Sequence, residues 1–200
     1  MVVILHVSDI HCILKPLERI LRRECGNVDV VAVTGDIECN GHIIRLLREC
    51  GKPVLVVTGN MDDQYIAKIL DEAGFNIESR LREYEGVWFA GVNGREPLTS
   101  MKRLEQLLKT RPRPLVIVAH HPPHGYVDKT WAGIHAGLYE ALRFIEKVRP
   151  DAYLCGHIHE ARGTARIGDT LIVNPGPAAK GYYAIVAVDE KGARAELRKA

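Results

Sequence analysis

The stretch "DAYLCGHIHE", residues 151–160, runs from an apolar segment through a glycine to His157 and His159, which one residue separates. A short apolar run of this kind is typical of a strand buried on both faces. Glycine then lets the backbone turn sharply and approach a ligand closely. The chain has nine histidines, so two neighbours could also arise by chance. Their meaning depends on whether similar side chains end other strands.

Other apolar runs with strand-like composition precede this one along the chain, at residues 2–7, 28–34, 53–58 and 115–119. Segments with the apolar spacing of amphipathic helices lie between them, at residues 14–21, 43–47, 65–73, 101–108 and 138–145. This alternation predicts βαβ units and a largely parallel sheet. Further strand patterns occur in "EGVWFAGV" and throughout the C-terminal third, and they predict a second, mixed sheet packed on the first. We therefore predict an α/β fold, a two-sheet sandwich flanked by helices.

Length and composition favour one soluble domain spanning residues 1–200, with 46% hydrophobic and 26% charged residues. The net charge of +2 excludes a general basic field for nucleic acid or anionic membranes. No apolar run is long enough to span a bilayer. The N-terminal segment lacks basic residues and reaches an acid at Asp9, so it indicates a first strand, not a signal peptide. A cytoplasmic location is expected.

The cysteines form no C-x-x-C pair, which excludes the spacing of a zinc knuckle or a redox motif. Their number is odd, at five, and they are Cys12, Cys25, Cys39, Cys50 and Cys155. The sequence therefore predicts free thiols in a reducing compartment.

Each of the five buried strands ends on a side chain that can bind a metal. The motifs are "SDIHC", "TGDIE", "TGNMDD", "AHHPP" and "CGHIHE", and they supply Asp9, His11, Asp36, Asn60, His120 or His121, His157 and His159. Because the carboxyl ends of parallel strands converge on one crevice, we expect these side chains to meet there. Two carboxylates, one amide oxygen and four imidazoles are too many ligands for one tetrahedral zinc ion. They suit two divalent ions, with Mn²⁺ favoured and Fe²⁺, Ni²⁺, Co²⁺ or Zn²⁺ as alternatives.

Taken in order, the motifs D-x-H, G-D, G-N, H-x-P-P and G-H-x-H resemble those of the calcineurin-like metallophosphoesterases, from Val7 to about Pro177. The resemblance implies that Asp9, His11 and His159 hold one metal ion. It implies that Asn60, His120 and His157 hold a second ion and that Asp36 bridges the two. The family pattern favours His120 over His121 as the ligand. Asp36, Asn60, His120 and His157 are the residues on which catalysis is expected to depend.

The family resemblance implies a binuclear phosphoester hydrolase in which a metal-bridging hydroxide is the nucleophile. The alternative is a scaffold of the same fold that has lost catalysis, and the complete ligand set argues against it. A nuclease for DNA ends would need further domains and a basic groove. The expected partner is a small phosphoester substrate, with no membrane and no duplex nucleic acid; self-association is left open.

The sequence departs from the family that it resembles after Asn60, where many members of that family carry a histidine and this chain has Met61. The family histidine contacts the phosphoryl oxygens and helps to protonate the leaving group, and a thioether can do neither. This change predicts a phosphodiesterase rather than a phosphomonoesterase. The alternative is that Met61 packs beneath the site while another histidine supplies the proton, namely His121, His124 or His135. Met61, His121 and His135 are the candidate substrate-binding residues.

Overall fold

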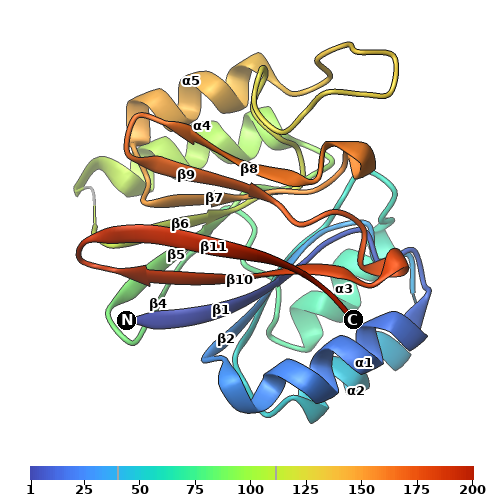
Figure 1. Ribbon diagram of the computed structural model, residues 1–200. Coiled ribbons are helices and arrows are strands. Elements are labelled where there is room, and N and C mark those ends of the chain that lie inside the picture. Colours follow the sequence, from blue (N-terminus) through green and yellow to red (C-terminus); the bar gives the residue numbers. More distant parts are fainter. Residues whose placement is uncertain (40, 111) are drawn as a thin grey trace.

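The computed structural model describes residues 1–39, 41–110 and 112–200, and it has two β-sheets that face each other with helices on both outer sides (Figure 1). The first sheet has the order β11-β10-β1-β2-β3. Its strands are β1 (Val2–Val7), β2 (Val30–Thr34), β3 (Val54–Val57), β10 (Tyr182–Asp189) and β11 (Gly192–Lys199). Strands β1, β2 and β3 are parallel, whereas β10 and β11 form an antiparallel hairpin beside β1.

The second sheet has the order β4-β5-β6-β7-β9-β8. Its central strands run parallel, and an antiparallel strand closes each edge. The strands are β4 (Leu81–Tyr84), β5 (Val87–Gly91), β6 (Leu115–Val118), β7 (Ala152–Leu154), β8 (Gly163–Ile167) and β9 (Thr170–Asn174). The predicted two-sheet architecture is confirmed.

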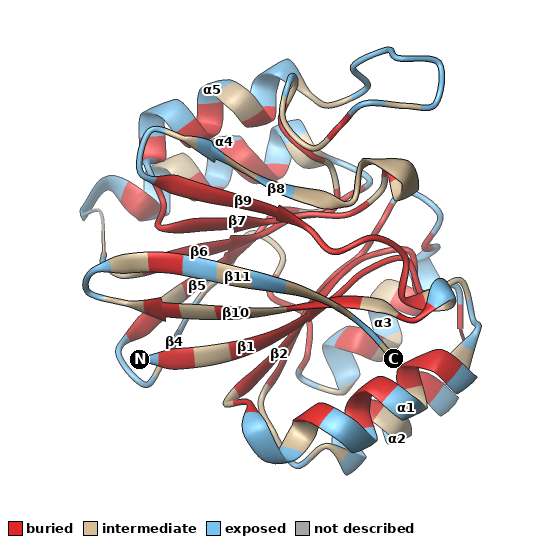
Figure 2. Cartoon of the chain, viewed as in Figure 1, coloured by how far each residue is buried: buried red, intermediate tan, exposed pale blue. Residues whose placement is uncertain are grey.

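Helices cover the outer face of each sheet, and their apolar sides pack on it (Figure 2). The first sheet carries α1 (Leu14–Glu24), α2 (His42–Glu49) and α3 (Gln64–Glu72), and the second carries α4 (Pro97–Leu107) and α5 (Tyr139–Val148). Short 3₁₀ turns follow at Cys25–Asn27, Leu108–Thr110, His159–Ala161 and Ala178–Lys180.

Alternate residues of each strand point to opposite faces of the sheet, so each central strand contributes to two layers of core. On β1, Leu5 and Val7 pack against the helices, whereas Ile4 points into the layer between the sheets. The same layer of core includes Phe89 and Val116, which come from the second sheet. This explains the nearly continuous apolar runs, since both faces of these strands are buried.

The distribution of strands between the sheets differs from the sequence prediction. The runs at 115–119 and 152–155 give β6 and β7, which lie in the second sheet and not beside β1–β3. The C-terminal strands are divided, with β8 and β9 in the second sheet and β10 and β11 in the first. A parallel strand that is buried on both faces has the same composition in either sheet, so sequence patterns do not reveal its neighbours.

The expectation of free thiols is wrong for four of the five cysteines. Cys12 pairs with Cys39 and Cys25 pairs with Cys50, while Cys155 is a buried free thiol. The partners lie 27 and 25 residues apart in the sequence, so no local motif marks them. Disulfides persist in oxidising compartments and in intracellular proteins of hyperthermophiles. The cysteines therefore no longer support a reducing compartment, and the cytoplasmic location stays a prediction.

Within the described ranges, none of the helices has the length and the apolar character needed to cross a bilayer.

The disulfide pairing predicts the number of thiols that a reagent can reach in the unfolded chain. In denaturant without reductant, titration should find one thiol, that of Cys155, and after reduction it should find all five. Each disulfide should also contribute about 2–4 kcal/mol to the free energy of unfolding, because it restricts the unfolded chain. Five thiols before reduction, in protein purified without reductant, would contradict the pairing.

Candidate metal centre

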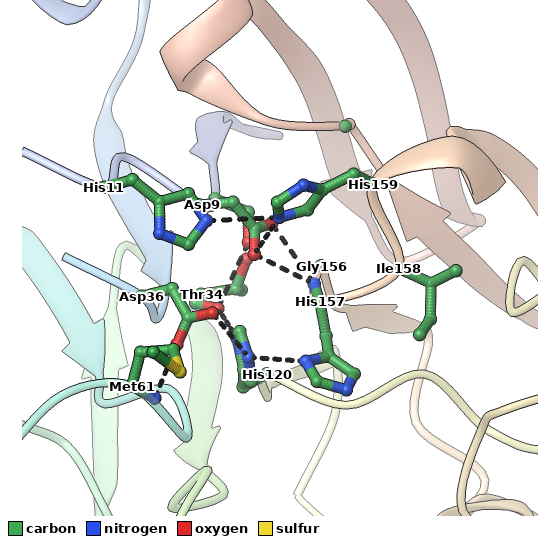
Figure 3. Close-up of polar contacts among 12 residues, drawn as sticks. Asp9, His11, Thr34, Asp36, Met61, His120, Gly156, His157, Ile158 and His159 are labelled. Atoms are coloured by element: carbon green, nitrogen blue, oxygen red, sulfur yellow. Dashed lines mark hydrogen bonds and ion pairs between the residues drawn. The ribbon is translucent and has the colours of Figure 1, made fainter. Parts of the chain in front are cut away.

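Two clusters of ligand-type side chains lie side by side at the carboxyl ends of the parallel strands (Figure 3). One consists of Asp9, His11 and His159, and the other of Asp36, His120 and His157. Within each cluster, one ligand atom from every residue lies within 4.8 Å of the others. The strands come from both sheets, since β1 and β2 precede the carboxylates and β6 and β7 precede His120 and His157.

In the first cluster, His159 Nε2 lies 3.3 Å from Asp9 Oδ1 and 3.2 Å from His11 Nε2. The other ring nitrogen of His11, Nδ1, lies 2.9 Å from a carboxylate oxygen of Glu38. With Nδ1–H donated to Glu38, the Nε2 of a neutral His11 carries a lone pair that points at the cluster. Nitrogen and oxygen lone pairs thus face one another, an arrangement that a cation stabilises.

In the second cluster, His120 Nε2 is surrounded by three other ligand-type atoms. It lies 2.9 Å from Asn60 Oδ1, 3.1 Å from His157 Nδ1 and 3.4 Å from Asp36 Oδ2. Its Nδ1–H donates a hydrogen bond to the Thr34 carbonyl oxygen, at 2.7 Å. A proton on Nε2 satisfies one of these neighbours at a time, whereas a divalent ion satisfies all of them. The donor set therefore fits a pair of metal ions.

Burial and mutual attraction keep the carboxylates charged. Burial works against ionisation of Asp36, but the hydrogen bond and the charge of His120 hold its pKa at about 2. For Asp9, burial is likewise outweighed by its bonds to His159 and Ser8 and by the charge of His120, so its pKa is lowered. Both side chains are therefore anionic near neutral pH, as ligands of divalent cations must be.

The pKa values of the cluster histidines shift in opposite directions. Burial lowers the pKa of His157, and the neighbouring charge of His120 lowers it further. Burial would also lower the pKa of His120, but its hydrogen bond to Asp36 and the charges of Asp9 and Asp36 raise it. The hydrogen bond to Asp9 raises the pKa of His159. His120 and His159, which each contact a cluster carboxylate, therefore bind a proton more readily than His157 does.

The backbone that carries the ligands is strained. Asp9, His11, Asp36 and His157 all have positive φ, at 54°, 46°, 51° and 67°. Such conformations cost about 1–3 kcal/mol each outside glycine and persist only where the surroundings enforce them. Here Ile10 N and His11 N both donate to the Asp36 carbonyl oxygen, at 2.9 and 3.0 Å. The loops after β1 and β2 therefore hold each other in place.

Asp62 binds two of these loops together, and sequence reasoning missed it. Its Oδ1 accepts from Ile37 N and Glu38 N, and its Oδ2 accepts from Gly59 N, each at 2.8 Å. Glu38, which orients His11, was also missed. A possible signal was an acidic residue two places after each motif residue, in "TGDIE" and "TGNMDD", since carboxylates often orient metal ligands from behind.

The candidate substrate-binding residues lie in different settings. The Met61 side chain is 58% exposed, so it does not pack beneath the site, and its backbone N–H donates to Asp36 Oδ1 at 3.0 Å. His121 is half-buried with its ring centroid 4.6 Å from that of His157, and burial lowers its pKa to about 3. His135 lies on the loop after β6, where its Nδ1 contacts Asp128 at 2.6 Å.

The sequence model of the calcineurin-like phosphoesterase family matches residues 2–161. An uncharacterized protein of Methanocaldococcus jannaschii, MJ1162, is 28% identical over 90% of this chain and 89% of its own length. The crystal structure of TT1561 of Thermus thermophilus is similar with a TM-score of 0.80 and 18% identity, over 99% of this chain and 98% of that one. An archaeal phosphodiesterase is similar with a TM-score of 0.53 and 18% identity, over 98% and 99%.

The close approach of Gly156 to the first cluster makes a prediction about metal affinity. A Cβ at this position would overlap Ser8 Oγ and lie 2.5 Å from Asp9 Oδ2, so Gly156→Ala must displace the carboxylate. We expect Mn²⁺ affinity, measured by calorimetric titration, to fall by roughly 10–100-fold, as for the loss of a group that orients a ligand. Gly26→Ala is the control, because a Cβ there meets nothing within 4 Å. Equal affinity in the two variants would contradict the arrangement.

Proposed function

Since this chain belongs to the calcineurin-like phosphoesterase family, we propose that it hydrolyses phosphodiesters at a binuclear centre formed by the two clusters. The observation that carries the proposal is the convergence of both clusters at one edge of the sandwich. Asp9, His11 and His159 hold one ion in this proposal, and Asn60, His120 and His157 hold the other. Ions bound there would polarise phosphoryl oxygens and lower the pKa of a water molecule.

Asp36 is the bridging residue in this proposal. Its Oδ2 faces His120 of the second cluster, while its main-chain carbonyl oxygen anchors the loop that carries His11 of the first. The Met61 N–H fixes the other carboxylate oxygen, Oδ1. Backbone and side chain of one residue thus connect both ligand sets, which supports a role for Asp36 in setting the separation of the ions.

The donor chemistry supports a proposal for the identity of the metal. The described ligand atoms are imidazole nitrogens and carboxylate or amide oxygens, with no thiolate among them. Mg²⁺ favours oxygen-rich sites, whereas Mn²⁺ and its neighbours among the transition metals accept imidazole readily. We therefore propose Mn²⁺ as the ion that supports activity best.

The preference for diesters rests on Met61. Its exposed thioether has no proton to donate and is only a weak acceptor, so it neither neutralises a dianionic monoester nor protonates a leaving alkoxide. A phosphodiester carries one negative charge less, and one with a good leaving group depends less on a general acid. Such an acid contributes about 10²–10⁴-fold where it is needed.

The test of the proposal is hydrolysis of an aryl phosphodiester by chelated protein, by protein resupplied with Mn²⁺, and by Asp36→Asn. Chelation should abolish activity, and Mn²⁺ should restore it. Asp36→Asn should lower kcat by at least roughly 10³-fold even with Mn²⁺ supplied, because a main electrostatic contact is lost. Asp71→Asn is the matched control, as this carboxylate lies on α3 in an exposed pair with Arg80. Turnover by verified metal-free protein, or full activity of Asp36→Asn, would refute the binuclear mechanism.

The role of Met61 predicts a ratio of activities. Wild type should have a higher kcat/KM for an aryl phosphodiester than for the corresponding monoester. Met61→His should raise the monoester activity relative to the diester by about 10-fold or more, since imidazole can donate a proton. Met61→Leu serves as the control, because it preserves size without adding a proton donor. A wild-type preference for the monoester that histidine leaves unchanged would show the argument to be wrong.

A further inference from the structure

A cavity of about 540 Å³ lies between the loop after β6 and the segment that directly follows His159. One wall is the segment from Glu160, the residue that directly follows His159, to Gly163. The opposite wall comes from the loop between residues 125 and 135, which projects beside the start of α5 (gold in Figure 1). The cavity thus shares one wall with the segment that directly follows His159, a residue of the first cluster.

The loop is fixed to the opposite wall and has internal order. Trp131 N donates to Glu160 Oε1 at 3.0 Å, and Asn174 Nδ2 donates to the Val127 carbonyl oxygen at 3.3 Å. Thr130 N donates to the Ile134 carbonyl oxygen at 2.9 Å, which closes a tight turn around the exposed tip. The backbone of the loop is thus held in place by its hydrogen bonds to Glu160 and Asn174.

A buried carboxylate orients the histidine of this cavity. Asp128 is 1% exposed, and its Oδ2 accepts from Gly125 N and Gly137 N at 2.9 and 3.0 Å. Its Oδ1 lies 2.6 Å from His135 Nδ1. Burial would raise the pKa of Asp128, but the hydrogen bonds from His135 and the two backbone amides lower it. The carboxylate is therefore charged, and its Oδ1 accepts a hydrogen bond from Nδ1–H of His135.

This orientation leaves the other nitrogen of His135 available to a ligand. The side chain is 44% exposed and lines the cavity. Within the described part of the chain, we find no hydrogen-bond partner for its Nε2. The hydrogen bonds from Gly125 N and Gly137 N to Asp128 already hold the loop together. They do not require a histidine at position 135. The pair resembles the way in which enzymes fix an imidazole that contacts substrate.

Trp131 supplies a flat apolar surface at the same cavity. Trp131 is 88% exposed, although its backbone N–H donates a hydrogen bond to Glu160. The ring is therefore open to solvent, while the hydrogen bond to Glu160 holds its backbone. Aromatic rings placed in this way bind planar groups by stacking.

We propose that this cavity is the leaving-group subsite of the metal centre and that it takes a planar aromatic group of a phosphodiester, either an aryl group or a nucleobase. Trp131 stacks on the ring, and His135 Nε2 hydrogen-bonds to its polar edge. The assignment of this cavity to a leaving group rests on the proposed hydrolysis. The binding that it describes needs no metal and can be measured without turnover.

The first measurement is therefore binding, followed by quenching of tryptophan fluorescence. Adenosine and phenol are the aromatic probes, and ribose and cyclohexanol are their non-aromatic counterparts. Trp88→Phe protein, in which Trp131 is the remaining tryptophan, should be quenched by aromatic probes and not by the counterparts. Quenching by adenosine alone assigns a nucleoside ligand, and quenching by both probes assigns aromatic groups in general. Quenching by neither overturns the proposal.

The second measurement is hydrolysis of bis(4-nitrophenyl) phosphate with Mn²⁺. Trp131→Ala and His135→Ala should each raise KM by about 10-fold with kcat changed less than threefold, as expected for loss of one stacking or hydrogen-bonding contact. Trp131→Phe should keep most of the affinity, and Leu98→Ala on α4 is the control for removing an exposed apolar side chain.

The two measurements separate the subsite from the chemistry. Turnover by wild type with an unchanged KM in Trp131→Ala overturns the subsite and leaves the hydrolase intact. Binding of adenosine or phenol by protein that hydrolyses no phosphoester retains the aromatic site and overturns the proposed function.

Discussion

The hydrogen bond from His157 N to the Asp9 carboxylate joins the two sheets at the candidate metal centre. Asp9 follows β1 of the first sheet, His157 follows β7 of the second, and both carboxylate oxygens lie 3.2 Å from the amide nitrogen. Asp9 is wholly buried, so its charge requires polar partners such as this donor, Ser8 and His159, or a cation. If the sheets moved apart, the carboxylate would lose a donor and both clusters would lose their shape. The packing of the two sheets against each other therefore also fixes the relative positions of the candidate ligands.

Conformational strain accompanies this arrangement. Four candidate ligands have positive φ, and their local preferences alone would favour other backbone shapes. Asp62 opposes relaxation by holding amides of two ligand loops at once. Its own pKa is raised because burial outweighs the hydrogen bonds that it accepts. Backbone strain is thus present at the strand ends that carry the candidate ligands, as is common where a site must be pre-formed.

Much of the site could be predicted from sequence because its residues directly follow apolar runs, as Asp36 follows β2 and His120 follows β6. Sheet membership could not be predicted, since β2 and β6 are both short, apolar and wholly buried although they belong to different sheets. Glu38 and Asp62 escaped notice because an acid in a loop is usually a solvated one. The pairing of Cys12 with Cys39 was hidden for another reason: two loops that are distant in sequence bring them together.

The strand order has a consequence for behaviour in concentrated solution. An unpaired strand edge is a template for adding a strand from another molecule. Here β4, β8 and β11 occupy edges and carry exposed charged residues, among them Arg82, Arg166 and Glu196. The remaining edge strand, β3, is partly capped, since Val56 exchanges backbone hydrogen bonds with Phe75 and Ile77. Charge at three edges and local pairing at the fourth disfavour the edge-to-edge growth that leads to amyloid-like aggregates.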